Sequence, residues 1–251
     1  MEEQAGILKI IEAYQQVHLS CKDGYSPVNH SFLREDVLLQ MHEYMLLFRK
    51  AFLAIGWDST DLQGKRVLDV GCAWGLRLNQ LLGFNFQPQN MYGIDLLEPY
   101  IQQARRFNTS VNYEVMSATE MRYNDRYFDF SFACVALSAM LNEEIIDRAL
   151  SEMCRVSKDF VLIIDNFDPS YEDHRDGILY FKGVDQRQIE KLTSRSDIAS
   201  ATKIGSFWTT GRMAWRVYSL LKKFQLESIA YSVAIGMLAK HSHKAFLIRK
   251  R

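Results

Sequence analysis

The stretch that decides the fold is Arg66-Val-Leu-Asp-Val-Gly-Cys-Ala-Trp-Gly75. Its first half is a short β-rich run bounded by Gly64 and Gly71, which predicts a strand. Glycine at position 71 permits a tight turn and a close approach of the backbone to a ligand. The helix expected from Leu76 begins with unpaired N–H groups that can face the same ligand. The stretch therefore predicts a strand, a ligand-binding loop and a helix.

The alternation of strand and helix continues to about residue 165. Further strands are expected at 90–95, 111–115, 128–135 and 160–165, and helices at 76–82, 99–107 and 142–156. Continuous apolar strands that alternate with helices indicate an α/β protein with a doubly wound parallel sheet. Beyond residue 170 we expect helices at 185–193 and 213–224 and strands near 227–233 and 244–248, the two strands forming an edge hairpin.

The first sixty residues predict two amphipathic helices, the second running from near Ser31 to Gly56. Because they precede the first strand, they need a surface to bury against. We expect residues 1–60 to form a helical cap over residues 61–251, in one compact unit. His30 and Arg34 either face the site from this cap or are polar residues at a helix end.

Composition bears on partners and compartment. Thirty basic residues balance thirty acidic ones, so no overall charge favours nucleic acid or a membrane. The cysteines are widely spaced, which favours reduced thiols in the cytoplasm over disulfides or zinc: Cys21, Cys72, Cys134 and Cys154. The N-terminus lacks a signal-peptide pattern, and the apolar stretch 128–141 is too short and polar to span a bilayer.

Three polar features follow three neighbouring strands, where a doubly wound sheet binds its ligand. They are the glycine loop, Asp95 at the end of the second strand, and Ser117-Ala-Thr119 after the third. Alone, the loop is an ordinary turn and Asp95 a helix cap. Together they indicate a nucleoside-containing cofactor, with Asp95 accepting the ribose hydroxyls.

These residues carry a family resemblance. Val67–Gly75 resembles the first motif of class I S-adenosylmethionine (SAM)-dependent methyltransferases, and Tyr92-Gly-Ile-Asp-Leu-Leu97 resembles the second. Residues 117–129 and 149–164 resemble later parts of the same family, so that the likeness covers about residues 60–170. The resemblance implies a Rossmann-like seven-stranded sheet whose last strand is antiparallel, an enzyme, and SAM as cofactor.

The resemblance also implies a role for each matching residue. It places contacts to the methionine part and the sugar in the glycine loop, at Asp69, Gly71, Cys72 and Gly75, and the contact to the ribose hydroxyls at Asp95. It places the adenine contacts at Leu96, Ser117 and Ala118, and the sulfonium beside the end of the fourth strand, at Cys134. Two positions depart from the family. Ala73 replaces a common glycine, and we expect it to adopt an ordinary negative φ. Ser117 replaces the usual acid, so that Thr119 or a backbone carbonyl would have to receive the adenine amino group.

Dinucleotide-binding dehydrogenases are the main alternative class of protein with a glycine loop after the first strand of such a sheet. Their fingerprint needs a third glycine close behind the first two. Here Arg77 and Leu78 follow Gly75, and the next glycine is Gly83. The spacing favours a nucleoside without a pyrophosphate.

SAM carries its own leaving group, so the protein supplies positioning and, for a hydroxyl acceptor, a base. His174 is a candidate base because histidine titrates near neutrality, and Asp165 because it ends a buried strand. A surface histidine and a capping carboxylate are the alternatives. The aromatic segment 207–215 either stacks on a flat acceptor or packs in the core, and the isolated pair His241/His243 predicts no metal site.

Three functions remain open. A diffuse resemblance of Lys182-Gly-Val184 and Leu226-Glu227 to bacterial methyltransferases of glycan and specialised-metabolite pathways favours O-methylation of a sugar, a glycan precursor or another small hydroxylated metabolite. A non-catalytic SAM- or nucleoside-binding partner subunit is the second. A protein or nucleic-acid methyltransferase is disfavoured by zero net charge and by the absence of an Asn-Pro-Pro-Tyr-type motif after the fourth strand. The acceptor and the oligomeric state stay open.

Overall fold

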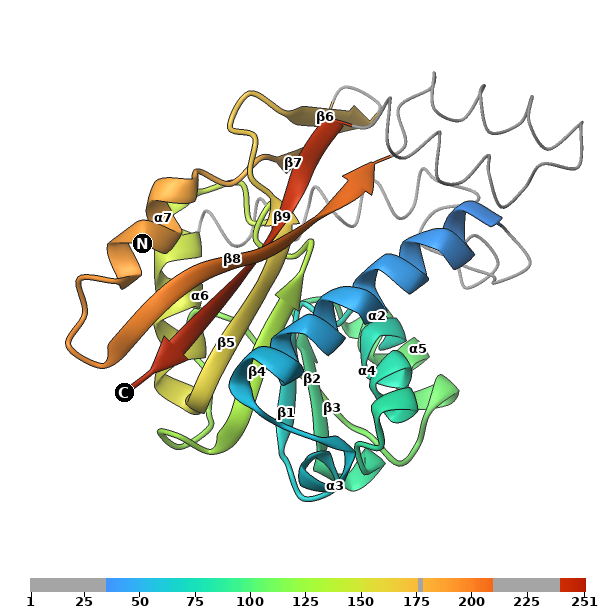
Figure 1. Cartoon of the computed structure of the whole chain (residues 1–251). Helices are drawn as coiled ribbons and strands as arrows, with labels where there is room; N and C mark the ends of the chain where they lie inside the picture. Colours follow the sequence, from blue (N-terminus) through green and yellow to red (C-terminus); the bar gives the residue numbers. More distant parts are fainter. Residues whose placement is uncertain (1–34, 176–177, 210–239) are drawn as a thin grey trace, which may run out of the picture.

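The computed structural model describes residues 35–175, 178–209 and 240–251, and a seven-stranded sheet lies at its centre (Figure 1). The strands, in chain order, are β1 (Val67–Val70), β2 (Met91–Asp95), β3 (Asn112–Val115), β4 (Phe128–Cys134), β5 (Ser157–Asn166), β8 (Ile198–Thr209) and β9 (Lys240–Lys250). Their order across the sheet is β3-β2-β1-β4-β5-β9-β8, with β1 to β5 parallel and β9 antiparallel to both neighbours. The predicted Rossmann-like sheet with an antiparallel last strand is confirmed.

The order of the strands fixes where a ligand can bind. The chain winds outward from β1 through β2 to β3, then returns to place β4 on the other side of β1. Val67 therefore pairs with Met91 of β2 and with Phe130 of β4. Where the strand order reverses, the loops that leave two neighbouring strands run in opposite directions. This leaves a crevice at the carboxyl ends of those strands, where a ligand can bind.

Helices cover both faces of the sheet, as expected for strands that are apolar throughout. Residues of α2, α4 and α5 pack on one face and residues of α6 and α7 on the other. The helices are α2 (Glu35–Ile55), α3 (Ser59–Leu62), α4 (Leu76–Leu81), α5 (Glu98–Phe107), α6 (Glu143–Val156) and α7 (Gln186–Leu192), with short 3-10 turns at Leu82–Phe84 and Pro88–Asn90.

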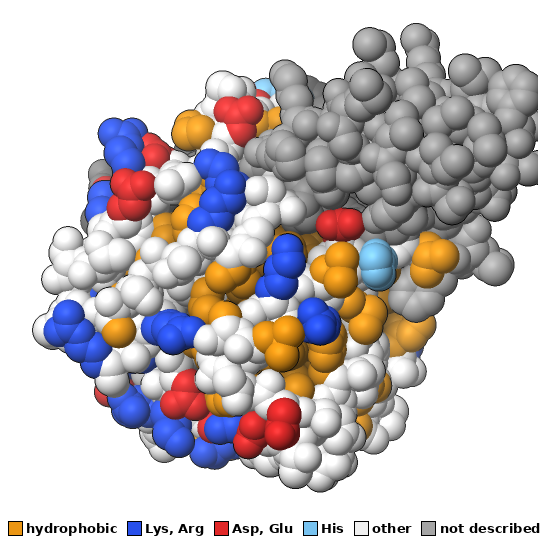
Figure 2. Space-filling model, viewed as in Figure 1, with side chains coloured by type: hydrophobic (Ala, Val, Ile, Leu, Met, Phe, Trp, Pro, Cys, Tyr) orange, Lys and Arg blue, Asp and Glu red, His pale blue; other side chains and the backbone are white. Residues whose placement is uncertain are grey.

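Helix α2 is the described part of the predicted cap, and it lies along the sheet. Phe48 packs edge-on against Phe132 of β4 with ring centroids 5.0 Å apart, and Phe52 packs in the same way on Phe130. On the outer side, Leu38 and Leu53 are more than half exposed. Figure 2 shows hydrophobic side chains, in orange, gathered on the middle of the face seen in Figure 1. The remainder of the cap, with His30 and Arg34, lies outside the described residues, and closure over the site stays a prediction.

The region after β5 differs from the sequence expectation. A hairpin of β6 (Glu172–Arg175) and β7 (Ile178–Lys182) lies where the sequence pattern predicted neither helix nor strand, and β9 confirms the strand near 244–248. Besides β5, the described antiparallel neighbour of β9 is β8, for which the sequence pattern predicted no strand. Three register shifts along the pairing of β8 with β9 break the two-residue alternation that signals a strand. The helix expected at 213–224 and the strand near 227–233 lie outside the described residues.

Candidate active site

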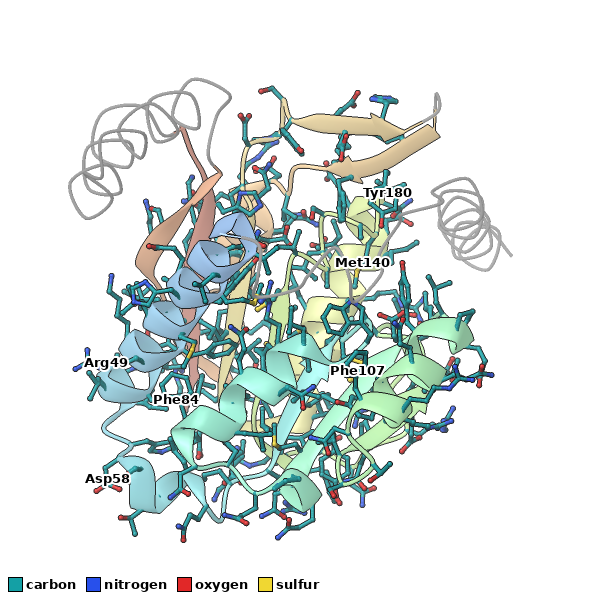
Figure 3. The ribbon with its side chains drawn as sticks, turned by 90° about the vertical axis from the view of Figure 1, so that its right-hand side faces the viewer. Arg49, Asp58, Phe84, Phe107, Met140 and Tyr180 are labelled. Atoms are coloured by element: carbon teal, nitrogen blue, oxygen red, sulfur yellow. The ribbon has the colours of Figure 1, made fainter. Side chains whose placement is uncertain are left out.

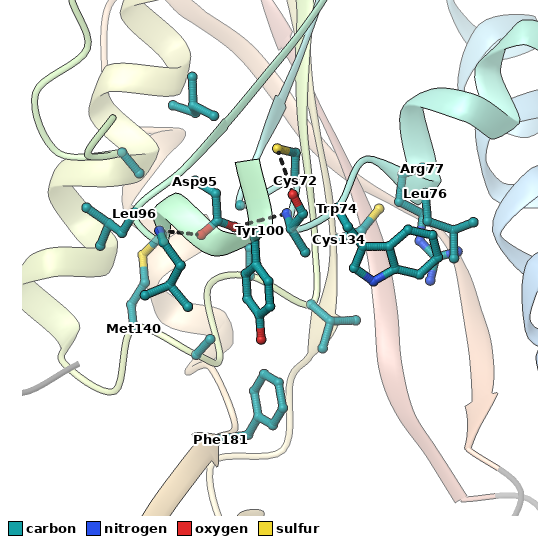
Figure 4. A pocket seen from close by; sticks show the side chains of 18 of the residues that line it. Cys72, Trp74, Leu76, Arg77, Asp95, Leu96, Tyr100, Cys134, Met140 and Phe181 are labelled. Atoms are coloured by element: carbon teal, nitrogen blue, oxygen red, sulfur yellow. Dashed lines mark hydrogen bonds between the residues drawn. The ribbon is translucent and has the colours of Figure 1, made fainter. Parts of the chain in front are cut away.

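A cavity of about 270 Å³ opens at the carboxyl ends of β1, β2 and β4 (Figure 4). The loop after β1, the start of α4, the end of β2 and the loop after β4 form most of its wall, and α2, α5 and β7 each add side chains. Six predicted site residues line it: Gly71, Cys72, Asp95, Leu96, Ala118 and Cys134. The structure thus brings together predicted residues from the ends of four strands, β1 to β4.

The loop after β1 is held tightly against β2. The N–H groups of Gly71 and Cys72 both donate to the carbonyl of Ile94, at 2.9 Å each. Gly71 and Gly75 adopt left-handed φ values of 74° and 83°. A Cβ added to Gly71 would lie 2.6 Å from the Cβ of Ala136 in the loop after β4. Glycine is therefore required at position 71 by conformation and by space.

Ala73 corrects one expectation. Its φ is +46°, in the left-handed region, whereas we expected an ordinary negative value. The backbone N–H of Ala73 donates to Oδ2 of Asp95 at 2.9 Å, which fixes the turn in this conformation. A residue with a Cβ in this region costs roughly 1–2 kcal/mol, so the loop carries local strain next to the cavity.

Asp95 lines the cavity and organises its neighbours. Oδ2 accepts from Ala73, and Oδ1 accepts from the N–H of Leu97 at 3.0 Å. Burial raises the pKa of Asp95 to about 6, against the opposing effect of these backbone hydrogen bonds. A carboxylate has about four lone-pair positions, so Asp95 retains capacity to accept two ribose hydroxyls.

Asp69 and Gly75 lie behind the cavity wall instead of on it. Asp69 is 1% exposed, and its Oδ2 is buried without a hydrogen-bond partner. Burial raises the pKa of Asp69 well above its usual value, and the charge of Arg77 partly opposes that shift. Gly75 precedes α4 and lies against the hydroxyl of Tyr113. An unpartnered buried carboxylate oxygen beneath the loop fits the ammonium group of an amino-acid-bearing nucleoside such as SAM.

Most of the remaining predicted cofactor residues line the cavity, and Ser117 does not. The Oγ of Ser117 forms a hydrogen bond with Oγ1 of Thr119 at 2.9 Å and accepts the Thr119 N–H. Ala118 beside it does line the cavity. Burial raises the pKa of the Cys72 and Cys134 thiols well above their usual range, so both act as neutral, apolar wall residues.

The two predicted bases are not brought to the cavity wall. Asp165 is fully buried at the end of β5, where Oδ2 accepts the N–H groups of Leu137 and Ser138 at 2.8 and 3.2 Å. Its Oδ1 accepts the N–H of Asn166 at 2.8 Å. His174 is half-exposed on β6, 3.9 Å from Glu172. Neither side chain lines the cavity, and the hydrogen bonds of Asp165 give it a structural task.

That task is to hold the loop that follows β4. Val135 has a φ of +55°, an outlier for a β-branched residue, and it lines the cavity. Its N–H donates to the carbonyl of Ile164, and Asp165 fixes the next residues of the loop. The N–H of Lys182 in β7 donates to the Ser138 carbonyl at 2.9 Å. Asp165 and β7 together maintain a strained wall segment beside the cavity.

The buried carboxyl of Asp165 predicts a pH dependence of stability. Burial raises its pKa from 3.8 to about 6, against hydrogen bonds from Ser138, Asn166 and Leu137. The folded chain then binds the proton more tightly than the unfolded chain. The resulting stabilisation is complete below pH 4 and is lost as pH rises through 6. We expect the unfolding free energy of wild type, relative to Asp165→Asn, to fall by roughly 3 kcal/mol between pH 4 and 7, at about 1.36 kcal/mol per pKa unit.

Urea unfolding of both proteins at several pH values measures this difference. The raised pKa of Asp95 is common to both proteins and cancels. A difference that stays constant with pH would contradict the buried, ionisable state of Asp165.

Several wall residues were not predicted from the sequence. Phe181 reaches the cavity from β7, and its ring lies 4.4 Å from that of Tyr180, in the hairpin above the strand ends (Figure 3). Tyr100 comes from α5 and Tyr44 from α2. Arg77 also lines the cavity, although the sequence pattern gave it no role beyond standing where a dehydrogenase loop would need a third glycine. Nothing in the local pattern distinguishes these side chains from core or surface residues, because their role depends on the tertiary arrangement.

The comparison with protein families finds one match in this region. Residues 67–159 match the family model described as a methyltransferase domain. A comparison with curated proteins finds no match. The family match covers β1 to the start of β5, which includes the glycine loop, Asp95 and the loop after β4.

Solved structures share the fold over most of the chain. A SAM-dependent methyltransferase from Archaeoglobus fulgidus is 17% identical with a TM-score of 0.54, over 75% of this chain and 88% of that chain. The YcgJ protein of Bacillus subtilis is 16% identical with a TM-score of 0.53, over 81% and 97%. Magnesium protoporphyrin IX methyltransferase from Synechocystis PCC 6803, solved with bound SAM, is 12% identical with a TM-score of 0.52, over 96% and 91%. At these identities the likeness shows the fold.

The family match over residues 67–159 is to a methyltransferase domain, and the sheet order is that of a fold shared with solved SAM-dependent methyltransferases. In the described ranges, no group of three or more His, Cys, Asp or Glu side chains is arranged to hold a metal ion. The helices described in the structure include none that is long and apolar enough to cross a membrane.

Proposed function

We propose that the protein transfers the methyl group of SAM to a hydroxyl of a small acceptor, namely a sugar, a glycan precursor or another small hydroxylated metabolite. The observation that carries the proposal is the composition of the cavity at the carboxyl ends of β1, β2 and β4. The predicted cofactor contacts Gly71 and Asp95 share it with Phe181 and Ala139, which none of the cofactor motifs accounts for. A cavity of about 270 Å³ suits small molecules better than a macromolecular segment.

The residues of the chain divide the work between binding and orientation. Asp95 binds the ribose hydroxyls, while the loop from Gly71 to Ala73 lies against the nucleoside. Bound SAM would supply an electrophilic methyl group and its own leaving group. Val135 and Ala136 then form the wall from which the acceptor approaches in line, with Phe181 on the far side. Because Asp165 and His174 do not line the cavity, we assign the rate acceleration to positioning.

Ligand binding provides the first test. We expect calorimetric titration to show saturable binding of SAM and S-adenosylhomocysteine and no binding of NAD at the same concentrations. The loop lacks the third glycine that lets a helix approach a pyrophosphate, and Leu78 packs there with no exposed surface. Binding of NAD without a SAM signal would refute the proposed cofactor.

Methyl transfer provides the second test. Extracts of the source cells, depleted of the protein, are incubated with the enzyme and methyl-labelled SAM, and then separated by size. The proposal expects label in the small-molecule fraction, in a product stable to mild base as an ether is. Label in protein or nucleic acid would refute a small acceptor. SAM binding without any transfer would favour the non-catalytic subunit.

A further inference from the structure

Part of the cavity wall comes from two elements that the cofactor motifs do not include. Helix α2 contributes Gln40, and β7 contributes Phe181. Both elements lie outside residues 67–159, the segment that matches the methyltransferase domain. In Figure 4 Phe181 lies on the side of the cavity away from Cys72 and Asp95. These side chains therefore belong to a part of the wall that can serve an acceptor instead of the cofactor.

Gln40 offers an unused amide at this wall. The side chain is half-buried, and within the described residues it takes part in no hydrogen bond. The nearby Gln80 differs, because its Nε2 donates to the Met41 carbonyl at 3.1 Å and its Oε1 accepts from Arg77 at 3.0 Å. An amide has two N–H donors and a carbonyl acceptor, so the amide of Gln40 can bind a hydroxyl group in either direction. A few polar groups on a mostly apolar wall fix the orientation of a bound small molecule.

The ring of Phe181 is held in place by the hairpin that carries it. The next residue, Lys182, donates its N–H to the Ser138 carbonyl in the loop after β4, at 2.9 Å. The ring packs edge-on against Tyr180, with ring centroids 4.4 Å apart. Phe181 is 8% exposed, so apolar surface that packs against it is removed from water. Strand β7 thus presents an ordered aromatic ring to the cavity.

An amide and an aromatic ring on the wall of one cavity suit a particular kind of acceptor. The face of an aromatic ring is electronegative, and it attracts the weakly positive C–H groups of a saturated ring. The hydroxyl groups at the edge of such a ring can bind an amide at the same time. A pyranose has both features. A phenol has a flat face and a single hydroxyl, which the methyl transfer itself would use.

We propose that Gln40 selects the acceptor: its amide binds a hydroxyl of a saturated, hydroxylated ring whose C–H face packs on Phe181. The inference rests on the proposed function and names the acceptor class and its contacts in the same cavity. It gives α2 a role in acceptor binding that the packing of the helix on Phe130 and Phe132 does not require. Gln40 holds the acceptor and takes no proton, in keeping with the assignment of the rate acceleration to positioning.

The first experiment measures transfer from saturating, methyl-labelled SAM to the dilute small-molecule fraction of the depleted cell extract, where the initial rate is proportional to kcat/KM. We expect Gln40→Leu to lower this rate by at least about tenfold, since an acceptor hydroxyl loses its partner. The affinity for S-adenosylhomocysteine should change by less than about twofold. Gln40→Glu keeps an acceptor oxygen at the same reach and should recover part of the loss. Gln102→Leu is the matched control, because Gln102 is exposed on α5, bonds to Glu98 and lies outside the cavity.

A ligand-side measurement needs no Gln40 variant. The methyl pyranosides of glucose, galactose and mannose, and phenol, are added to wild type with bound S-adenosylhomocysteine, and saturation-transfer NMR detects their contact with the protein. We expect saturable binding of at least one pyranoside and no binding of phenol. Phe181→Leu should weaken the bound pyranoside by at least about threefold, because the aromatic face is lost. The wild-type comparison remains valid if Gln40→Leu fails to fold, which thermal unfolding would reveal.

The outcomes separate the two proposals. A wild-type rate for Gln40→Leu would overturn the inference and leave the proposed function standing. Equal losses of nucleoside binding and of transfer in Gln40→Leu would show a purely structural glutamine and also overturn it. Absence of pyranoside binding, with or without binding of phenol, would overturn the saturated ring as the acceptor class. If wild type transfers no label to the small-molecule fraction, the proposed function itself fails.

Discussion

Replacement of Asp95 by alanine is expected to lower the affinity for SAM and S-adenosylhomocysteine by at least about tenfold. The carboxylate is proposed to accept two ribose hydroxyls, and a hydrogen bond to a charged group contributes roughly 1.5–3 kcal/mol. About 1.4 kcal/mol corresponds to a factor of ten in affinity. Asp95 also accepts the N–H groups of Ala73 and Leu97, so its loss releases the strained loop as well.

Calorimetry on the purified variant measures this loss, with Glu98→Ala as the control. Glu98 is an exposed carboxylate three residues further along, at the start of α5, and it bonds to Gln102. Its removal should leave nucleoside affinity unchanged. An Asp95→Ala protein with wild-type affinity would remove the ribose contact from this position.

Replacement of Gly71 by valine is expected to abolish detectable SAM binding and to lower stability. Gly71 has a φ of +74°, and a Cβ there would lie 2.6 Å from the Cβ of Ala136. A left-handed conformation alone costs roughly 1–2 kcal/mol for a residue with a side chain, and a β-branched side chain adds crowding. We therefore expect the unfolding free energy to fall by at least about 2 kcal/mol.

Gly64→Val is the matched control, because Gly64 has open space around it and no left-handed φ. Urea unfolding and nucleoside titration are compared for the two variants. The control should stay within about 0.5 kcal/mol of wild type, as surface substitutions usually do. Normal SAM binding by both Gly71→Val and Asp95→Ala would show that the cofactor lies elsewhere.

The centre of the fold could be predicted from the sequence because its signals are local. Phe160–Ile164 is a continuous apolar run and Val67–Val70 is apolar except for Asp69, and both are buried in the sheet as such runs predict. Gly71 directly follows β1 and Asp95 ends β2, so the topology of a doubly wound sheet brings them together without further information. For the same reason most of the predicted cofactor residues line one cavity.

The parts that could not be predicted depend on non-local contacts. Register shifts hide β8 from a two-residue pattern, and its partner β9 is distant in the chain. The left-handed φ of Ala73 is imposed by its bond to Asp95, 22 residues away. Asp165 has the sequence context of a catalytic carboxylate, but its task is set by the N–H groups of Leu137 and Ser138. The residue type determines which interactions a side chain can make, and its neighbours in the folded chain determine which of them it makes.

The placement of β9 between β5 and β8 also governs how the nascent chain assembles. Translation delivers the five parallel strands first, yet the β8 edge attaches to the described sheet only through β9, which follows residues 210–239. Until residues 240–250 leave the ribosome, β5 presents an open edge whose residues Val161–Ile164 are fully buried in the finished protein. Such an edge is a template for pairing with other chains. We therefore expect a chain that ends between β8 and β9 to be prone to aggregate through this edge.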